Sequence, residues 1–290
     1  MKSAISSIRE KIAPHVDRTW TDTMGNLYAE KKSRAANGPR VMLAAHMDEV
    51  ALMITRIDPK GLLYFKTLGG IDRRVLPAKP VIIGRRRVPG VIGTKAVHLL
   101  EPEESGRAVP LRELYIDIGA KNKEEAEKLV TVGEGAVFQS RFCTLGGNRV
   151  RGKALDNRAG CSALVELLQY EYPVSLTAVF TVQEEVGLRG ARIAAYNLKP
   201  DLALVLETTT AGDVPGAKPH QVSTRLGQGP ALTIMDRTLI AHRQLLTALE
   251  ETARRLDKPY QWKQSATGGT DGGAIHLTGA GIPTAVVAVP

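Results

Sequence analysis

Four separate apolar runs in this chain each lead to a histidine or a carboxylate. Two examples are Val-Met-Leu-Ala-Ala before His46 and Leu-Ala-Leu-Val-Leu before Glu207. Continuous apolar runs are typical of strands that are buried on both faces of a parallel sheet. In such sheets, ligands gather where strands end. The pattern therefore predicts an α/β fold with a polar site at one edge of the sheet.

Strand-like and helix-like segments alternate in the second half of the chain. Residues 157–170 carry alanine and leucine at near-helical spacing, and a strand-like run follows at 174–182. The remaining predicted elements are a helix at 189–196, a strand at 202–206, a helix at 240–256 and a strand at 284–289. This order predicts a central, mostly parallel sheet flanked by helices.

Residues 52–147 have a different sequence pattern. Short β-rich stretches alternate there with glycine and proline, which indicates an inserted β-rich, barrel-like domain. The main domain would then be discontinuous, made of residues 1–51 and 148–290.

The amino-acid composition excludes several classes of function. With 290 residues and 43% hydrophobic content, the chain can bury a sizeable core. A net charge of +9 is moderate, and aromatic residues make up only 4%, which argues against a nucleic-acid substrate. Cys143 and Cys161 cannot form a disulfide framework, and no run is long enough to span a membrane. We expect a cytoplasmic protein.

His46 and Asp48 lie two residues apart at the end of a predicted strand. On an extended backbone both side chains point to one face, where Asp48 can orient the imidazole. A histidine with satisfied hydrogen bonds at a strand end is the alternative. Asp156 follows a glycine-containing turn; taken alone it suits a helix N-cap, and as part of a site it can bridge two divalent ions.

The adjacent Glu184 and Glu185 face opposite ways on an extended segment, so we expect them to divide their roles. One would bind metal, and the other would act as general base beside the activated water. Two solvated surface acids are the alternative. Glu207 ends an apolar run, where an unpaired buried carboxylate is unfavourable and metal coordination would keep it ionised.

His276 follows Gly-Gly-Thr-Asp-Gly-Gly-Ala-Ile, which we interpret as a flexible loop that carries a ligand. The stretch lacks the lysine and the helix start of a phosphate-binding loop. Two histidines with several carboxylates suit two divalent ions, Zn, Co or Mn, better than a structural thiolate-bound zinc.

Five strings in this chain resemble the tetrahedral aminopeptidase family of dinuclear metallopeptidases, which includes glutamyl aminopeptidases and has often been labelled cellulase or endoglucanase. The strings are Ala-His-Met-Asp-Glu-Val (45–50), Lys-Ala-Leu-Asp-Asn-Arg (153–158), Thr-Val-Gln-Glu-Glu-Val-Gly-Leu-Arg-Gly-Ala (181–191), Ala-Gly-Asp-Val-Pro-Gly (211–216) and Gly-Thr-Asp-Gly-Gly-Ala-Ile-His (269–276). They occur in the family's order along nearly the whole chain.

The resemblance implies a role for each of these residues. One ion would be held by His46, Asp156 and Glu207, and the other by Asp156, Glu185 and His276. Glu184 would be the catalytic base, and Asp48 the catalytic partner that orients His46. Thr270 and Asp271 would lie at the substrate pocket.

The resemblance also implies an assembly. The insert would serve dimerisation, and dimers would assemble into a hollow dodecameric tetrahedron that trims short peptides from their amino ends. This chain departs from the family in three respects. Glu207 stands where most members have aspartate, and members usually continue after the last strand with an Arg-Tyr-containing loop and a helix. Members also usually have a turn before the first helix, which this sequence enters directly.

Other functions stay open at this point. A metal-dependent deacylase or another amide hydrolase on the same core would use the same ligands, but without requiring a free amino terminus. A non-catalytic assembled paralogue would retain the ligands without turnover. A glycosidase is disfavoured, because its paired carboxylates need no histidine ligands and no metal pair.

Overall fold

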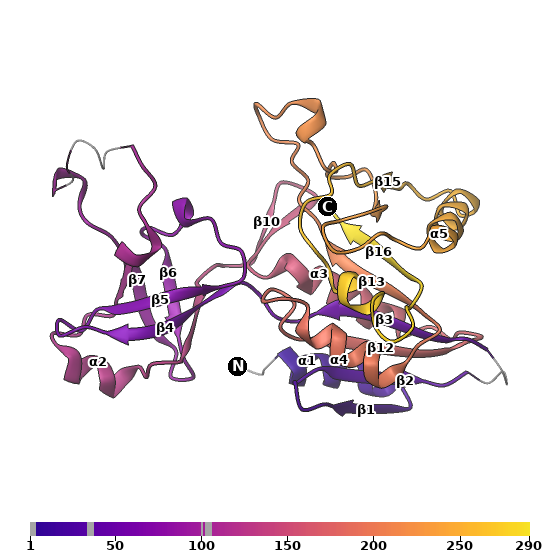
Figure 1. The fold of residues 1–290 in the computed structure, drawn as a ribbon, viewed down its shortest axis with the longest axis horizontal. Helices are drawn as coiled ribbons and strands as arrows, with labels where there is room; N and C mark the ends of the chain where they lie inside the picture. Colours follow the sequence, from indigo (N-terminus) through magenta and orange to yellow (C-terminus); the bar gives the residue numbers. More distant parts are fainter. Residues whose placement is uncertain (1–3, 34–37, 100, 102–105) are drawn as a thin grey trace. The chain divides into compact units, whose positions relative to one another are not determined.

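The computed structural model describes residues 4–33, 38–99, 101 and 106–290. The chain divides into two compact units (Figure 1). Unit 1 comprises Met1–Asp48 and Ala154–Pro290, and unit 2 comprises Glu49–Lys153. No helix in the described part of the chain is long and apolar enough to cross a membrane.

An eight-stranded mixed sheet forms the centre of unit 1. In spatial order its strands are β1 (Arg18–Thr21), β2 (Leu27–Lys31), β12 (Ser175–Thr181), β3 (Arg40–His46), β13 (Leu202–Thr208), β16 (Thr284–Val289), β14 (Ala231–Thr233) and β15 (Gln261–Trp262). The four strands from β12 to β16 in this order are mutually parallel, whereas β2 and β14 pair antiparallel with their inner neighbours. The predicted α/β class is confirmed, with antiparallel strands towards both edges.

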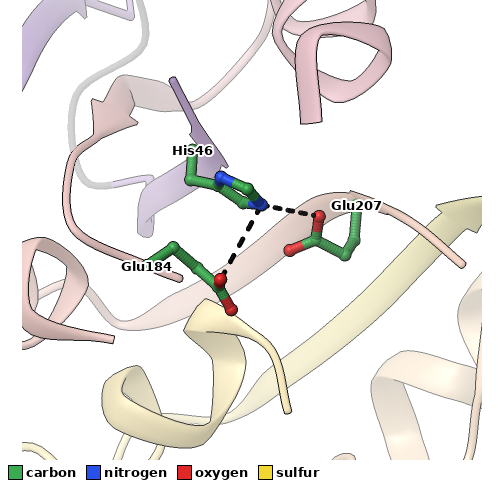
Figure 2. A group of neighbouring side chains, drawn as sticks. All are labelled: His46, Glu184 and Glu207. Atoms are coloured by element: carbon green, nitrogen blue, oxygen red, sulfur yellow. Dashed lines mark ion pairs between the residues drawn. The ribbon is translucent and has the colours of Figure 1, made fainter. Parts of the chain in front are cut away.

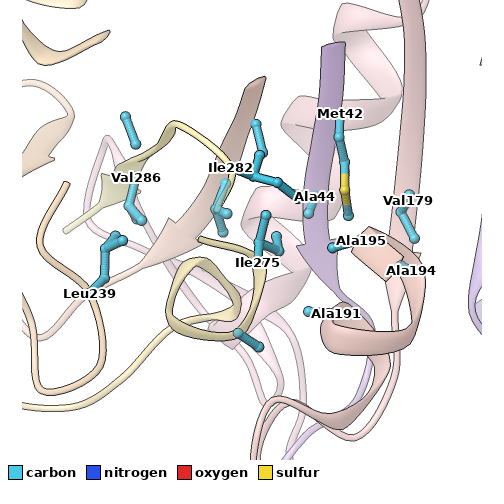
Figure 3. Close-up of a cluster of buried hydrophobic side chains, with 14 of the residues drawn as sticks. Met42, Ala44, Val179, Ala191, Ala194, Ala195, Leu239, Ile275, Ile282 and Val286 are labelled. Atoms are coloured by element: carbon cyan, nitrogen blue, oxygen red, sulfur yellow. The ribbon is translucent and has the colours of Figure 1, made fainter. Parts of the chain in front are cut away.

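Helices cover the sheet because their apolar residues pack on its alternating side chains. The helices of unit 1 are α1 (Ala4–Ile12), α3 (Leu155–Leu167), α4 (Arg189–Leu198), α5 (Arg243–Arg255) and α6 (Asp271–Ile275). Helices α1 and α3 share a buried cluster with Leu43 and Ala45 of β3. Helices α4 and α6 share another cluster with Met42 and Ala44 of the same strand, as Figure 3 shows. The alternation along β3 thus assigns one cluster to each face of the sheet.

Unit 2 is built around a closed barrel. Its strands, in spatial order, are β4 (Ala51–Ile57), β5 (Leu63–Leu68), β8 (Tyr115–Asp117), β7 (Val88–Gly93), β6 (Pro80–Ile83) and β9 (Gly135–Phe138). Strands β10 (Cys143–Leu145) and β11 (Arg149–Arg151) form a separate hairpin. The helix α2 (Lys123–Leu129) is capped by Asn122, whose side chain accepts a hydrogen bond from Glu125 N. The expected barrel-like β-rich insert is confirmed; its role in dimerisation stays a prediction.

Short 3-10 turns connect several of these elements. They are η1 (Ala13–His15), η2 (Arg73–Val75), η3 (Val97–Leu99), η4 (Leu111–Glu113) and η5 (Pro219–Gln221).

Candidate metal centre

The carboxyl ends of three neighbouring parallel strands bring the candidate ligands together. Strand β3 ends at His46, which pairs in register with Thr181, the last residue of β12. The segment after β12 carries Glu184 and Glu185. On the other side of β3, Val205 pairs with Ala44, so Glu207, two residues further along β13, projects from the same face as His46.

The His46 imidazole lies among carboxylates. Its Nε2 atom is 3.0 Å from Asp156 Oδ1, 3.3 Å from Glu207 Oε1 and 3.9 Å from Glu184 Oε2. Figure 2 shows Glu184 and Glu207 directed towards this nitrogen from two different segments. The side chains of His46, Glu207 and Glu184 are 2%, 5% and 10% exposed, whereas that of Asp156 is 64% exposed. Solvent therefore reaches the cluster on the side of Asp156.

Asp48 lies behind the imidazole. Its Oδ1 atom is 3.6 Å from His46 Nδ1, which is too long for a direct hydrogen bond. Its two oxygens accept hydrogen bonds from the backbone N–H groups of Glu184, at 3.1 Å, and Glu185, at 3.2 Å. Asp48 therefore fixes the glutamate segment against the end of β3.

Two neighbours of Asp156 fix its position. Asn157 is fully buried; its Nδ2 donates to Leu206 O at 2.8 Å, and its Oδ1 accepts from Gly160 N at 3.0 Å. Arg158 Nε donates to Met47 O at 2.9 Å. These bonds connect the start of α3 to β13 and to the segment after β3. Neither residue was predicted as part of the site, although both directly follow Asp156 in the Asp-Asn-Arg string.

Burial and like charges shift the proton affinities of the cluster. Burial raises the pKa of Glu184 to about 9, with a further contribution from the charge of Asp271. Burial also raises the pKa of Glu185 to about 7, together with the charge of Asp156. The pKa of His46 is raised as well: burial opposes its protonation, but the hydrogen bond to Asp156 and the nearby carboxylates outweigh that effect.

The residues present fit divalent cations. Two groups offer candidate ligand atoms that lie within 4.8 Å of one another: His46 with Glu184 and Glu207, and His46 with Asp156 and Glu185. Glu207 Oε2 is buried without a hydrogen-bond partner among the described residues. Four carboxylates around one imidazole repel one another unless protons or cations compensate them, and mixed nitrogen and oxygen ligands are the set that Zn, Co and Mn accept.

His276 is not part of either group among the described residues, and its role as a metal ligand stays a prediction. The glycine-rich stretch is not a flexible loop. It forms helix α6 after Thr270, and His276 ends this helix with Nδ1 3.0 Å from Gly272 O. The histidine lines a cavity of about 300 Å³ together with residues outside the cluster, namely Ile240, His242, Gly281, Ile282, Pro283 and Thr284.

Thr270 and Asp271, expected at the substrate pocket, are buried. Thr270 Oγ1 donates to Asp236 Oδ2 at 3.0 Å, and Thr181 Oγ1 donates to Asp271 Oδ2. Both side chains therefore fasten α6 to its neighbours, and their role at the substrate pocket stays a prediction. Asp271 still acts on the cluster, because its charge raises the pKa of Glu184.

Comparisons with known proteins place the chain in a family. Residues 25–290 match the family model described as M42 glutamyl aminopeptidase. A putative aminopeptidase of Acetivibrio thermocellus is 42% identical over 286 residues, which cover 98% of this chain and 83% of that protein.

Two solved structures have the same fold. The TET aminopeptidase from the marine sediment archaeon Thaumarchaeota archaeon SCGC AB-539-E09 has a TM-score of 0.94 and 38% identity, covering 98% of this chain and 82% of that one. The Pyrococcus horikoshii TET1 peptidase, described as able to assemble into a tetrahedron or a large octahedral shell, has a TM-score of 0.85 and 33% identity, covering 98% and 84%. These matches confirm the resemblance found in the sequence, and the chain belongs to the M42 glutamyl aminopeptidase family.

Proposed function

We propose that this peptidase-family member is a metal-dependent aminopeptidase that removes the first residue from short peptides. The observation that carries the proposal is the cluster of one imidazole and four carboxylates where β12, β3 and β13 end beside the start of α3, with His46 and Glu207 buried in it. Such a concentration of negative charge around a histidine suits cations better than it suits any role in stability.

We assign the metal-binding role to His46, Asp156, Glu185, Glu207 and His276. The first four lie together in the structure, and the role of His276 rests on the family resemblance. Asp156 would serve both ions, as the resemblance implies, and Glu207 would contribute its buried, unpartnered oxygen. When bound, Zn, Co or Mn ions supply positive charge that polarises the scissile carbonyl and lowers the pKa of water.

We assign the proton transfer to Glu184. It would accept a proton from the attacking water and pass it to the leaving amine. Its surroundings suit this role, because burial and the charge of Asp271 raise its pKa and so make the carboxylate a stronger proton acceptor, while bound cations would favour its ionised form. The hydrogen bond from Glu184 N to Asp48 fixes the backbone from which the carboxylate extends, so that Asp48 positions the base. Asp48 would act on the imidazole through its charge, at 3.6 Å from His46 Nδ1.

The substitution Glu184→Gln tests this assignment. It keeps the size of the side chain but removes its capacity to take a proton, so turnover should fall about 100-fold or more while metal content stays unchanged. Metal would be measured by elemental analysis and turnover with aminoacyl nitroanilides. Full activity of Glu184→Gln with both metals bound would remove Glu184 from the mechanism.

We also propose a homo-oligomer located in the cytoplasm. The fold shared with the TET1 peptidase of Pyrococcus horikoshii supports assembly of dimers into a tetrahedral dodecamer, with unit 2 as the dimerisation domain. The cytoplasmic location is supported by the absence of a disulfide between Cys143 and Cys161, both of which are free.

A further inference from the structure

One surface of unit 1 carries exposed apolar side chains around two hollows. It is formed by α4, by residues 276–284 after α6 and by residues 237–243 before α5. We call it the α4–α6 surface, because these two helices pack against each other (Figure 3). Its exposed apolar side chains include Tyr196, Ile240 and Leu277, which are 64%, 76% and 73% exposed. Single exposed apolar side chains are common on protein surfaces, but a group of them in one place is typical of a binding site.

The two hollows adjoin each other. One has a volume of about 370 Å³ and is lined in part by Tyr196, and the other has a volume of about 300 Å³ and is lined in part by Ile240. Gly281 and Ile282 line both. Leu277 lies between the hollows, because the residue before it lines one of them and the residue after it lines the other. Hollows bordered by exposed apolar side chains are places where the anchor side chains of a partner insert.

The charged side chains of the α4–α6 surface are all basic. Residues 186–200, 237–249 and 272–290 contain no aspartate or glutamate. Asp201, which follows directly, is paired with Arg40. The exposed basic residues form no ion pair with a described carboxylate; they are Arg189, Arg192, Lys199, Arg237 and Arg243. A surface whose charges have one sign attracts groups of the opposite sign.

The charge and the hollows together indicate which kind of partner fits. A second copy of this chain is disfavoured, because the chain has a net charge of +9 and two basic surfaces repel each other. A nucleic acid would match the charge but would bury little of the exposed apolar surface. An anionic membrane would bury protruding apolar side chains but has no side chains of its own to fill the hollows. A polypeptide segment meets both conditions, because it presents apolar side chains as well as carboxylates.

We propose that the α4–α6 surface docks a segment of another polypeptide in which apolar side chains are flanked by aspartate or glutamate. The apolar side chains insert into the two hollows beside Tyr196 and Leu277, and the carboxylates pair with Arg192 and Lys199. Arg192 lies one helical turn before Tyr196 and so shares its face of α4, and Lys199 lines the larger hollow. This role is separate from the proposed aminopeptidase function, because it requires neither bound metal nor a free amino terminus.

The test uses an array of N-acetylated peptides of randomised sequence, attached to a support by their carboxyl ends. The acetyl group prevents them from binding as aminopeptidase substrates. Peptides that bind the metal-loaded wild type should be enriched about 2-fold or more in aspartate and glutamate, with apolar residues beside them. Arg192→Glu should abolish this acidic enrichment and should shift the preference towards lysine and arginine.

The peptide of the array that binds best is then synthesised with its N-acetyl group and a fluorescent label and used in titrations. Its Kd should rise about 10-fold or more in Leu277→Glu and in Arg192→Glu. Leu256→Glu and Arg255→Glu are the matched controls, because they change the same residue types at exposed positions at the end of α5. These controls should change Kd by less than about 2-fold.

An array with no bound peptides, or with bound peptides that are not enriched in acidic residues, would overturn the proposal, and so would an unchanged Kd in both variants. Two further results would assign the surface to a different occupant. A lower particle mass of Leu277→Glu than of wild type in sedimentation velocity would indicate a second copy of the chain. Binding of phosphatidylserine vesicles in place of peptides, lost in both variants, would indicate a membrane. Activity on free-amine substrates tests the proposed aminopeptidase function separately.

Discussion

At the scale of single residues, the cluster combines groups that would repel one another in the absence of a cation. Glu184, Glu185 and Glu207 all have raised pKa values, with burial as the first cause in each. Protons can compensate the negative charge, and so can divalent ions. Metal and protons should therefore compete for this site.

This competition predicts how the stability of metal-free protein depends on pH. The pKa values of Glu184 and Glu185 are raised to about 9 and about 7, against about 4.3 in an unfolded chain. Between these values the native state holds protons that the unfolded chain has released, so stability falls as pH rises. The raised pKa of His46 acts in the same direction above pH about 6.5.

We therefore expect Tm of chelator-treated protein to fall by at least about 3 °C between pH 5 and pH 9, measured by scanning calorimetry. Bound metal should flatten the dependence, and Glu184→Gln should reduce it in the metal-free state. A metal-free Tm that is constant or rises over this range would contradict the charge arrangement.

The residues of the centre could largely be predicted from the sequence, because each follows a recognisable strand or a characteristic string. The conformation of the stretch before His276 could not. The glycines there suggest a loop, but Gly272 and Gly273 leave room for Leu239 and Thr238, so the stretch packs as a helix.

At the scale of elements, the contact between α3 and β13 holds both sides of the metal centre. A Cβ atom added at Gly160 would lie 2.5 Å from Leu206 O and would also meet the Asn157 side chain. The helix thus approaches the strand closely, and Asn157 spans the contact. Asp156 and Glu207 extend from the two elements that this contact joins.

Gly160→Ala should therefore weaken both stability and metal binding. Forcing a methyl group into this contact should lower the free energy of unfolding by about 1–3 kcal/mol. Denaturant unfolding and metal titration measure the two effects. Gly70→Ala, where an added Cβ meets no atom within 4 Å, is the control. Unchanged unfolding and unchanged metal affinity in Gly160→Ala would show that the helix can move without disturbing the site.

The length of an element decides how well its bounds could be predicted from the sequence. The long central elements were predicted nearly to their ends; for example, β16 spans Thr284–Val289, as the apolar run indicates. The order of strands in the sheet depends on contacts between distant segments, which local patterns do not specify. Strand β14 and the edge strand β15 next to it have three and two residues, too few for a periodic signal.

At the scale of the whole molecule, the two units have separate cores. The chain passes from unit 1 to unit 2 after Asp48 and returns before Ala154, and Glu49 and Lys153 form an ion pair beside these crossings. Unit 2 therefore begins and ends at one place, as an insertion does. Such an inserted unit is free to serve assembly while unit 1 holds the site.

Assembly predicts a defined particle mass. A dodecamer of 31.3 kDa chains has a mass of about 380 kDa, which sedimentation velocity distinguishes clearly from a dimer. We expect the dodecamer, or a dimer as its building block at high dilution. A stable monomer at micromolar concentration would contradict the proposed assembly without affecting the metal centre.

The most direct test of the central claim measures nitroaniline release from free and N-acetylated aminoacyl nitroanilides. Protein stripped of metal by a chelator would be assayed with and without added Co or Zn. The account predicts no cleavage by stripped protein, restored cleavage of the free-amine substrates when metal is added, and no cleavage of the acetylated ones. Cleavage that needs no metal, or metal-restored cleavage of the acetylated substrates, would contradict a metal-dependent aminopeptidase, and the second result would favour a deacylase or another amide hydrolase.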